Sequence, residues 1–267
     1  MDKTFQNMTE PSPARMPVIF AAHGAPVLLD DASWTSELSD WARAMPRPGS
    51  ILMVSAHWEQ RPATLGATQT LPLVYDFYGF PERYYRVRYA APGAPGLAVR
   101  VRQILHDAQI GVAESPGRGL DHGAYVPLAA MYPEADIPVL QVSMPVLDTR
   151  ELFRLGAALA ALRDEGVLIF GSGFLTHNMN HAFRPGTPAW AREFDAWVAE
   201  AILRFDVDAL MDFQVRAPSA RLALPTWEHY APLLVAAGAA CDTPTATFPI
   251  SGWWLDGAFT RRSVQFG

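Results

Sequence analysis

The 267-residue chain contains a single cysteine, Cys241, and no Cys-x-x-Cys pair. One thiol cannot form an internal disulfide framework, and zinc ribbons and iron–sulfur clusters both need several cysteines. Cys241 stands between Ala240 and Asp242 after an apolar helical pattern, which indicates a buried or incidental thiol rather than a nucleophile. We therefore expect a protein of the reducing cytoplasm.

Basic residues are also few: 21 Lys and Arg stand against 27 Asp and Glu, for a net charge of −6. Because nucleic-acid binding depends on Lys and Arg that neutralise phosphates, and no predicted helix carries a basic stripe, we expect no nucleic-acid partner. No apolar run approaches the roughly 18 residues that span a bilayer, so we expect no membrane partner. Residues 1–15 are polar and lack the apolar core of a secretory signal, and we expect them to form a flexible lead-in.

Hydrophobic residues, by contrast, make up half of the chain and follow two kinds of pattern. Short continuous runs are typical of strands buried on both faces, and they lie at 17–22, 51–56, 137–144 and 167–171. Stripes of helical period lie at 34–41, 148–166, 190–202 and 230–239. This order predicts a single α/β domain over residues 16–267, with a mainly parallel central sheet covered by helices on both faces.

Three histidines, His23, His57 and His177, each follow one of the apolar runs, and His229 lies in a polar break at 225–229. In an open α/β sheet, ligands collect outside the carboxyl ends of the strands, and neutral imidazole is the commonest metal ligand among side chains. The repeated placement of a histidine after a strand therefore predicts a metal site. Zinc, copper and non-haem iron all accept imidazole, so the ligand type leaves the metal open.

The remaining histidines have weaker patterns. His122 lies in a glycine-flanked segment that we predict to be a turn, where a structural role and a role in the site are equally supported. His106 is predicted on an exposed helix surface, and His181 in a loop outside the site. Two segments without a stable period, 72–93 and 216–228, are of the kind that is usually functional in a compact domain. Gly-Ser-Gly at 171–173 is too short for the nucleophile elbow of a serine hydrolase, and no phosphate-binding glycine pattern is present.

Seven short motifs stand in order along residues 17–267: His23-Gly-Ala-Pro26, Ser55-Ala-His-Trp58, Tyr75-Asp-Phe-Tyr-Gly-Phe-Pro81, Gly119-Leu-Asp-His-Gly123, Tyr132-Pro-Glu-Ala-Asp-Ile-Pro138, Gly171-Ser-Gly173 with Thr176-His-Asn178, and Pro225-Thr-Trp-Glu-His229. Each motif is weak alone, but the set is specific and covers nearly the whole chain. Together they resemble the DOPA-dioxygenase type of extradiol ring-cleaving dioxygenases, within the class III protocatechuate 4,5-dioxygenase superfamily.

The resemblance implies non-haem Fe(II) held by His23, His57 and His229, with His177 as either a further ligand or the acid–base histidine. Zinc can occupy such a site in purified protein, but it is redox-inert. Glu228 competes with His229, because the common iron triad elsewhere is two histidines and a carboxylate. If this segment is helical, the two neighbours project about 100° apart and only one of them can face the metal. The resemblance favours His229.

The resemblance further implies a catechol and O₂ as small-molecule partners, and opening of the aromatic ring to a semialdehyde. His177 would move protons, a task that suits a histidine of near-neutral pKa, and His122 would make a second polar contact to substrate or oxygen. We expect the irregular aromatic segment to line an aromatic pocket. The predicted substrate-binding residues are Tyr75, Phe80, Phe174 and Tyr125. Pairing of a substrate carboxylate by Arg86 or Arg88 is as well supported as a packing role.

Three positions depart from the family pattern: Leu224 stands for a histidine, Phe174 for an asparagine and Tyr125 for a tryptophan. These changes predict a more apolar pocket and leave open which catechol is the substrate. Two other functions stay open at this point: a zinc-dependent hydrolase with Glu228 as base, and a non-catalytic binding protein on the same scaffold. The oligomeric state is not indicated by the sequence.

Overall fold

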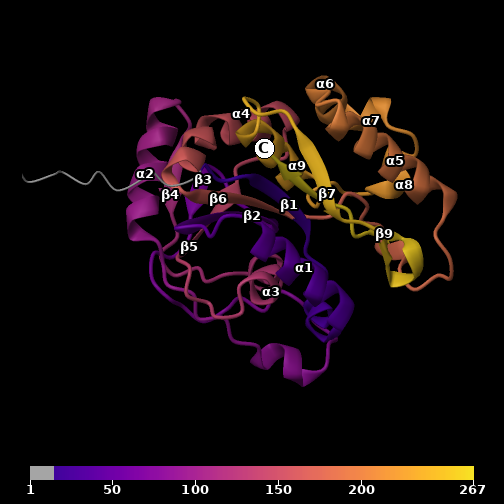
Figure 1. The fold of residues 1–267 in the computed structure, drawn as a ribbon, viewed down its shortest axis with the longest axis horizontal. Coiled ribbons are helices and arrows are strands. Elements are labelled where there is room, and N and C mark those ends of the chain that lie inside the picture. Colours follow the sequence, from indigo (N-terminus) through magenta and orange to yellow (C-terminus); the bar gives the residue numbers. More distant parts are fainter. Residues whose placement is uncertain (1–14) are drawn as a thin grey trace, which may run out of the picture.

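The computed structural model describes residues 15–267, apart from the side chain of Asp256, and its centre is an eight-stranded sheet (Figure 1). The flexible lead-in predicted for residues 1–15 therefore lies, except for Arg15, outside the described residues. Met16 is buried, and its backbone N–H donates to the carbonyl of Arg163 at 3.0 Å. The strands of the sheet are β1 (Val18–Ala22), β2 (Ser50–Glu59), β3 (Ala63–Leu65), β4 (Val112–Glu114), β5 (Val139–Met144), β6 (Val167–Gly173), β7 (Ala246–Ile250) and β10 (Ser263–Phe266).

The strand order is β4-β3-β5-β2-β6-β1-β10-β7, and the four central strands β5, β2, β6 and β1 are mutually parallel. The register places Val18 opposite Ile169 and Ile51 opposite Leu168. Antiparallel pairing occurs toward the edges, where β10 joins β1 and β7, and β3 joins β5. Two further short strands, β8 (Trp253–Trp254) and β9 (Phe259–Thr260), form a separate hairpin. The prediction of a mainly parallel central sheet is confirmed.

Successive side chains of a strand point in opposite directions, so each central strand contributes residues to the cores on both faces of the sheet. In β1, Val18 and Phe20 belong to one hydrophobic core, and Ile19 and Ala21 belong to the other. The first core is covered by α2 (Pro95–Asp107), α4 (Thr149–Leu159) and α9 (Ala231–Ala239), and the second by α1 (Ala32–Ala44) and α3 (His122–Met131) (Figure 1). Helices therefore cover both faces of the sheet, as predicted.

Four helices, α5 (Ala189–Leu203), α6 (Val207–Met211), α7 (Phe213–Arg216) and α8 (Ala220–Ala223), extend the first core beyond β7 (Figure 1). The predicted helical stripes appear as α1, α4, α5 and α9. Asp148 caps α4, where its side chain accepts from the backbone N–H groups of Arg150 and Glu151 at 3.0 Å. Of the helices in the described part of the chain, none is both long and apolar enough to cross a lipid bilayer.

The structure corrects two expectations, on His122 and His57, and decides two points that the sequence left open, on the segment before α9 and on Cys241. His122 does not lie in a turn: it is the first residue of α3, a helix that the sequence pattern did not predict because its residues are buried on nearly every side. β2 continues to Glu59, so His57 lies within the strand rather than after it. The segment before α9 is a turn, so Glu228 and His229 are not on a helix. Cys241 is exposed rather than buried.

Candidate metal centre

The carboxyl ends of β1, β2 and β6 meet at one edge of the sheet, because these strands are parallel neighbours. His23 directly follows β1, His57 lies two residues before the end of β2, and His177 follows β6 after a short loop. Segments that are far apart in the sequence therefore bring three imidazoles to the same edge.

Two more imidazoles lie at this edge, one at the start of helix α3 and one in the turn before helix α9. His122 opens α3, and the buried Asp121 before it accepts from the backbone N–H of Ala124 at 3.2 Å, which fixes the start of the helix. His229 lies in the turn before α9, and its carbonyl accepts from the backbone N–H of Phe174 at 2.9 Å. A Cβ atom at Gly173 would collide with this carbonyl. The glycine at the end of β6 is therefore a packing requirement, and it places His229 beside the strand end.

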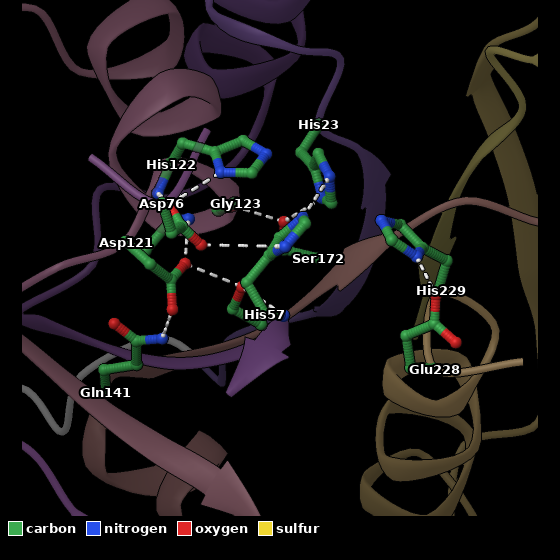
Figure 2. A network of polar contacts seen from close by, with 12 residues as sticks. His23, His57, Asp76, Asp121, His122, Gly123, Gln141, Ser172, Glu228 and His229 are labelled. Carbon is green, nitrogen blue, oxygen red and sulfur yellow. Dashed lines mark hydrogen bonds and ion pairs between the residues drawn. The ribbon is translucent and has the colours of Figure 1, made fainter. Parts of the chain in front are cut away.

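The five imidazoles form one cluster. Figure 2 shows His23, His57 and His122 pointing toward one another, with His229 facing them. The Nε2 atoms of His23 and His57 are 3.1 Å apart, and the ring centroids of His57 and His122 are 3.9 Å apart. The ring of His229 lies 5.4 Å from that of His23 and 4.9 Å from that of His57. His177 stacks on His229, with ring centroids 3.5 Å apart and an angle of 9° between the planes.

Each of the three predicted ligands has a partner for its Nδ1 atom. His23 Nδ1 lies 3.1 Å from the hydroxyl of Ser172, which itself donates to the carbonyl of Gly123 and so accepts from the imidazole. His229 Nδ1 lies 2.9 Å from Glu228, and His57 Nδ1 lies 3.6 Å from Asp76.

The hydrogen bonds to Ser172 and Glu228 place the ring proton of His23 and His229 on Nδ1 and leave the lone pair on Nε2, the form in which a histidine binds a metal through Nε2. The Asp76 carboxylate lies beyond hydrogen-bond distance of His57 Nδ1, but its charge favours the same form. Two such lone pairs, those of His23 and His57, then face each other at 3.1 Å. Two acceptors at this distance repel unless a cation or a proton lies between them. The arrangement therefore fits a bound metal ion.

Burial keeps four of these imidazoles neutral, those of His23, His57, His177 and His229. Desolvation, with smaller contributions from the neighbouring histidines, lowers the pKa of His23 and of His229 well below the usual value. Desolvation also lowers the pKa of His57 to about 3 and that of His177 to about 4. Neutral imidazole is the form that coordinates metals and accepts protons. These four side chains can therefore do either at neutral pH.

Asp76 is a site residue that the sequence patterns did not single out. Its Oδ1 atom accepts from both the backbone N–H and the Nδ1 of His122, at 3.1 and 2.7 Å. Burial alone would raise the pKa of Asp76, but the hydrogen bonds from His122 and the proximity of His57 hold it below the usual value. In the sequence it lay in the irregular segment 72–93 and within the motif that spans 75–81, but neither pattern assigned it a role.

The position of Glu228 bears on the choice between it and His229. Its carboxylate accepts from His229 Nδ1 at 2.9 Å and lies 4.0 Å from His177 Nδ1. Glu228 therefore lies behind the His229 ring, where it orients the imidazole, in the way that carboxylates commonly support metal-binding histidines. Two groups of side chains have ligand atoms within 4.8 Å of one another: His23, His57 and His122, and His177, Glu228 and His229. The first group is all imidazole, a ligand set that suits zinc, copper, iron or nickel.

Residues 18–260 match the family described as the catalytic LigB subunit of aromatic ring-opening dioxygenase. The chain belongs to this LigB family. It is 41% identical over 255 residues to a 4,5-DOPA dioxygenase extradiol of Beta vulgaris, covering 92% of this chain and 95% of that one. It is 35% identical over 264 residues to the protein of the same name from Escherichia coli K12, covering 96% of each. A crystal structure of an uncharacterized protein from Escherichia coli K12 superimposes with a TM-score of 0.80 at 34% identity, over 95% of this chain and all of that one. The protein is thus an extradiol ring-opening dioxygenase, and the resemblance noted from its motifs is confirmed.

In this LigB-family enzyme a cavity of about 270 Å³ opens beside the histidine cluster. Two of the four predicted substrate-binding residues, Phe80 and Phe174, line it. Phe77, from the aromatic segment expected to line the pocket, also lines it. Apolar residues that the sequence did not single out contribute further to the wall: Val27, Met179, Phe183, Trp254, Leu255 and Phe259.

The other two predicted pocket residues lie elsewhere. The hydroxyl of Tyr75 donates to the carbonyl of Val87 at 2.7 Å, and Tyr75 lines a different surface depression. Tyr125 lies on α3 and is fully buried in the second core. Leu224, which we expected to alter the pocket, is buried in the core on the opposite face of the sheet. Neither Arg86 nor Arg88 lines the cavity; Arg86 is exposed and pairs with Glu82.

Proposed function

We propose that this LigB-family enzyme uses non-haem Fe(II) to cleave a catechol with O₂, opening the ring next to one hydroxyl to give a semialdehyde. His23, His57 and His229 would hold the iron. The observation that carries the proposal is the pair of Nε2 atoms of His23 and His57, which face each other at 3.1 Å, with the ring of His229 beside them at 5.4 and 4.9 Å.

The metal, when bound, would supply the one-electron chemistry that O₂ requires, which redox-inert zinc does not offer. The protein's share is to hold the catechol beside the cluster and to move its protons. The cavity satisfies the first condition, because the histidine cluster forms its base and aromatic rings form its walls.

His177 is our candidate for proton transfer. It lines the cavity, its ring is stacked on the predicted ligand His229, and it is neutral at pH 7 because burial lowers its pKa to about 4. The lone pair of a neutral imidazole can accept the proton of a catechol hydroxyl and return it to an oxygen of the product. With a pKa of about 4, His177 is a weaker base than the near-neutral histidine expected from the sequence. Its Nδ1 atom lies 4.0 Å from Glu228, which favours the protonated ring when it forms.

His122 is our candidate for a second polar contact to substrate or O₂. Because Asp76 binds its Nδ1 at 2.7 Å, the Nε2 atom is the free nitrogen of the ring, and the residue lines the cavity. This nitrogen accepts a hydrogen bond, which suits contact with a hydroxyl group.

No observation favours a zinc hydrolase. That chemistry needs a carboxylate base directed at the metal-bound water, and the carboxylate we considered for it, Glu228, is instead bound to the Nδ1 of His229.

The experiment is anaerobic reconstitution with Fe(II), followed by oxygen-electrode assays with DOPA, protocatechuate, gallate and caffeate. We expect one O₂ consumed per catechol and a new yellow semialdehyde absorbance. His57→Ala should abolish both, whereas His106→Ala, a histidine whose side chain is 83% exposed and outside the cluster, should leave them unchanged. One iron bound per chain without O₂ uptake on any catechol would contradict the proposal.

A further inference from the structure

We propose that the cavity selects catechols with an uncharged, apolar substituent over catechols whose substituent carries a carboxylate or an amino-acid group. This inference rests on the proposed catechol dioxygenase function and concerns the part of the substrate that points away from the histidines.

The first argument is charge. Apart from the imidazoles, every lining side chain that the structure describes is apolar, and none is Lys, Arg, Asp or Glu. The two carboxylates closest to the cluster, Asp76 and Glu228, stand behind His122 and His229 and are engaged in hydrogen bonds with them. A carboxylate on the substituent, which points away from the histidines, would lose water without meeting a positively charged side chain, which is strongly unfavourable.

The second argument is volume. An apolar cavity of roughly 150 Å³ in another protein binds benzene. The present cavity, at about 270 Å³, has room for a catechol ring and a substituent of several carbon atoms beyond it.

The third argument is the chemistry of the walls. Phe174 and Trp254 lie parallel, with ring planes within 2° and centroids 6.0 Å apart, and Phe259 meets Phe174 edge-on at 5.5 Å. Phe77 and Phe80 form a second aromatic pair at 5.4 Å. Such surfaces attract apolar groups and offer no hydrogen-bond donor to a carboxylate, apart from the indole N–H of Trp254.

The fourth argument is the entrance. Met179 and Phe183 line the cavity, yet they are 62% and 72% exposed, which is unusual for large apolar side chains. A substituent that extends from the ring toward the entrance would cover both side chains and remove their apolar surface from water.

The test compares catechols that differ only at the end of the side chain: 4-propylcatechol, 3-(3,4-dihydroxyphenyl)propanoate and DOPA. DOPA is included because the relatives described above are named for it. With the Fe(II)-loaded enzyme we expect kcat/KM for 4-propylcatechol to exceed that for each charged compound by about tenfold or more. From 4-methylcatechol to 4-propylcatechol, kcat/KM should rise about fourfold per methylene group.

A variant at the entrance should remove most of the preference. Met179→Lys places a cation at the entrance and should raise kcat/KM for the propanoate, relative to 4-propylcatechol, by about tenfold. The matched control is Val215→Lys on α7, a side chain that is 90% exposed and does not line the cavity, and it should leave the ratio unchanged.

Anaerobic equilibrium binding of the same compounds separates this inference from the proposed function. If no catechol is turned over but 4-propylcatechol still binds more tightly than the propanoate, the dioxygenase proposal fails and the selectivity of the cavity stands. If the catechols are turned over and the charged compounds equal or surpass 4-propylcatechol, the selectivity is overturned and the dioxygenase proposal stands.

Discussion

Replacing Asp76 with asparagine changes a single group that lies against two imidazoles of the cluster. In the native protein, Oδ1 accepts from His122 Nδ1 at 2.7 Å, and Oδ2 lies 3.6 Å from His57 Nδ1. An asparagine keeps one acceptor for His122 and directs its NH₂ group, a donor, at His57. This donor disfavours a proton on the Nδ1 of His57 and favours one on Nε2, where it would occupy the lone pair that faces His23. We expect weaker metal binding.

The size of the effect follows from the geometry. Removing a partner that orients a metal-binding histidine typically lowers metal affinity 10- to 100-fold. Because the contact between Asp76 and His57 is long, at 3.6 Å, we expect the lower end of this range, about tenfold or about 1.4 kcal/mol. The rate should fall as well, since His122 is held by the same carboxylate.

Competition with a chromophoric chelator at fixed pH measures the metal affinity. The control is Asp136→Asn, which removes a half-exposed carboxylate that pairs with Arg47 at 2.6 Å, away from the cluster. The control should bind metal like the unmodified enzyme. If Asp76→Asn is folded and binds metal as tightly as the control, the argument from the ring proton is refuted.

Three further predictions concern the imidazoles of the cluster. His229→Ala should lose the metal, whereas His122→Ala should retain it and lose rate, as metal analysis of the two purified variants will show; the reverse result would place His122 in the ligand set. His177→Gln should retain the metal and lower kcat by about 10²- to 10⁴-fold, and an unchanged single-turnover rate would exclude it from proton transfer. In the metal-free protein, burial lowers the pKa values of His57 and His177 from 6.5 to about 3 and about 4. The unfolded chain therefore binds more protons below pH 6.5, so stability is full above that pH and falls as the pH drops toward 4. At pH 5 the loss is about 2 kcal/mol for each histidine, measurable by urea unfolding at pH 7 and pH 5, and equal stability at both would contradict the burial argument.

The sequence could predict those residues of the site that lie at or near the ends of the central strands. Strands buried on both faces appear as continuous apolar runs, so the ends of β1, β2 and β6 could be located to within a few residues. Because parallel neighbours end at the same edge, it followed that His23, His57 and His177 would meet. The end of β2 was placed too early, since the strand continues through His57 to Glu59.

The parts that could not be predicted have no regular hydrophobic periodicity in the sequence. α3 is buried on nearly every side, so no amphipathic stripe distinguished it from a buried loop, and His122 was assigned to a turn. In the irregular segment 72–93, local hydrogen bonds decide which way each side chain points. The hydroxyl of Tyr75 is bound to Val87, and it is Phe77 and Phe80 that line the cavity.

The distribution of the cluster along the chain has a consequence for how the protein matures. The proposed ligands come from His23, His57 and His229, and the last of these is placed by the turn before α9. A chain that has been synthesised only as far as β6 can build most of the parallel sheet but lacks one ligand. Because contacts of such long sequence separation form late in folding, and metal affinity depends on all the ligands being in place, tight metal uptake would mark the completion of folding rather than its beginning. A redox-active ion would then bind only after the cavity has formed, where the surrounding side chains limit which molecules can reach it.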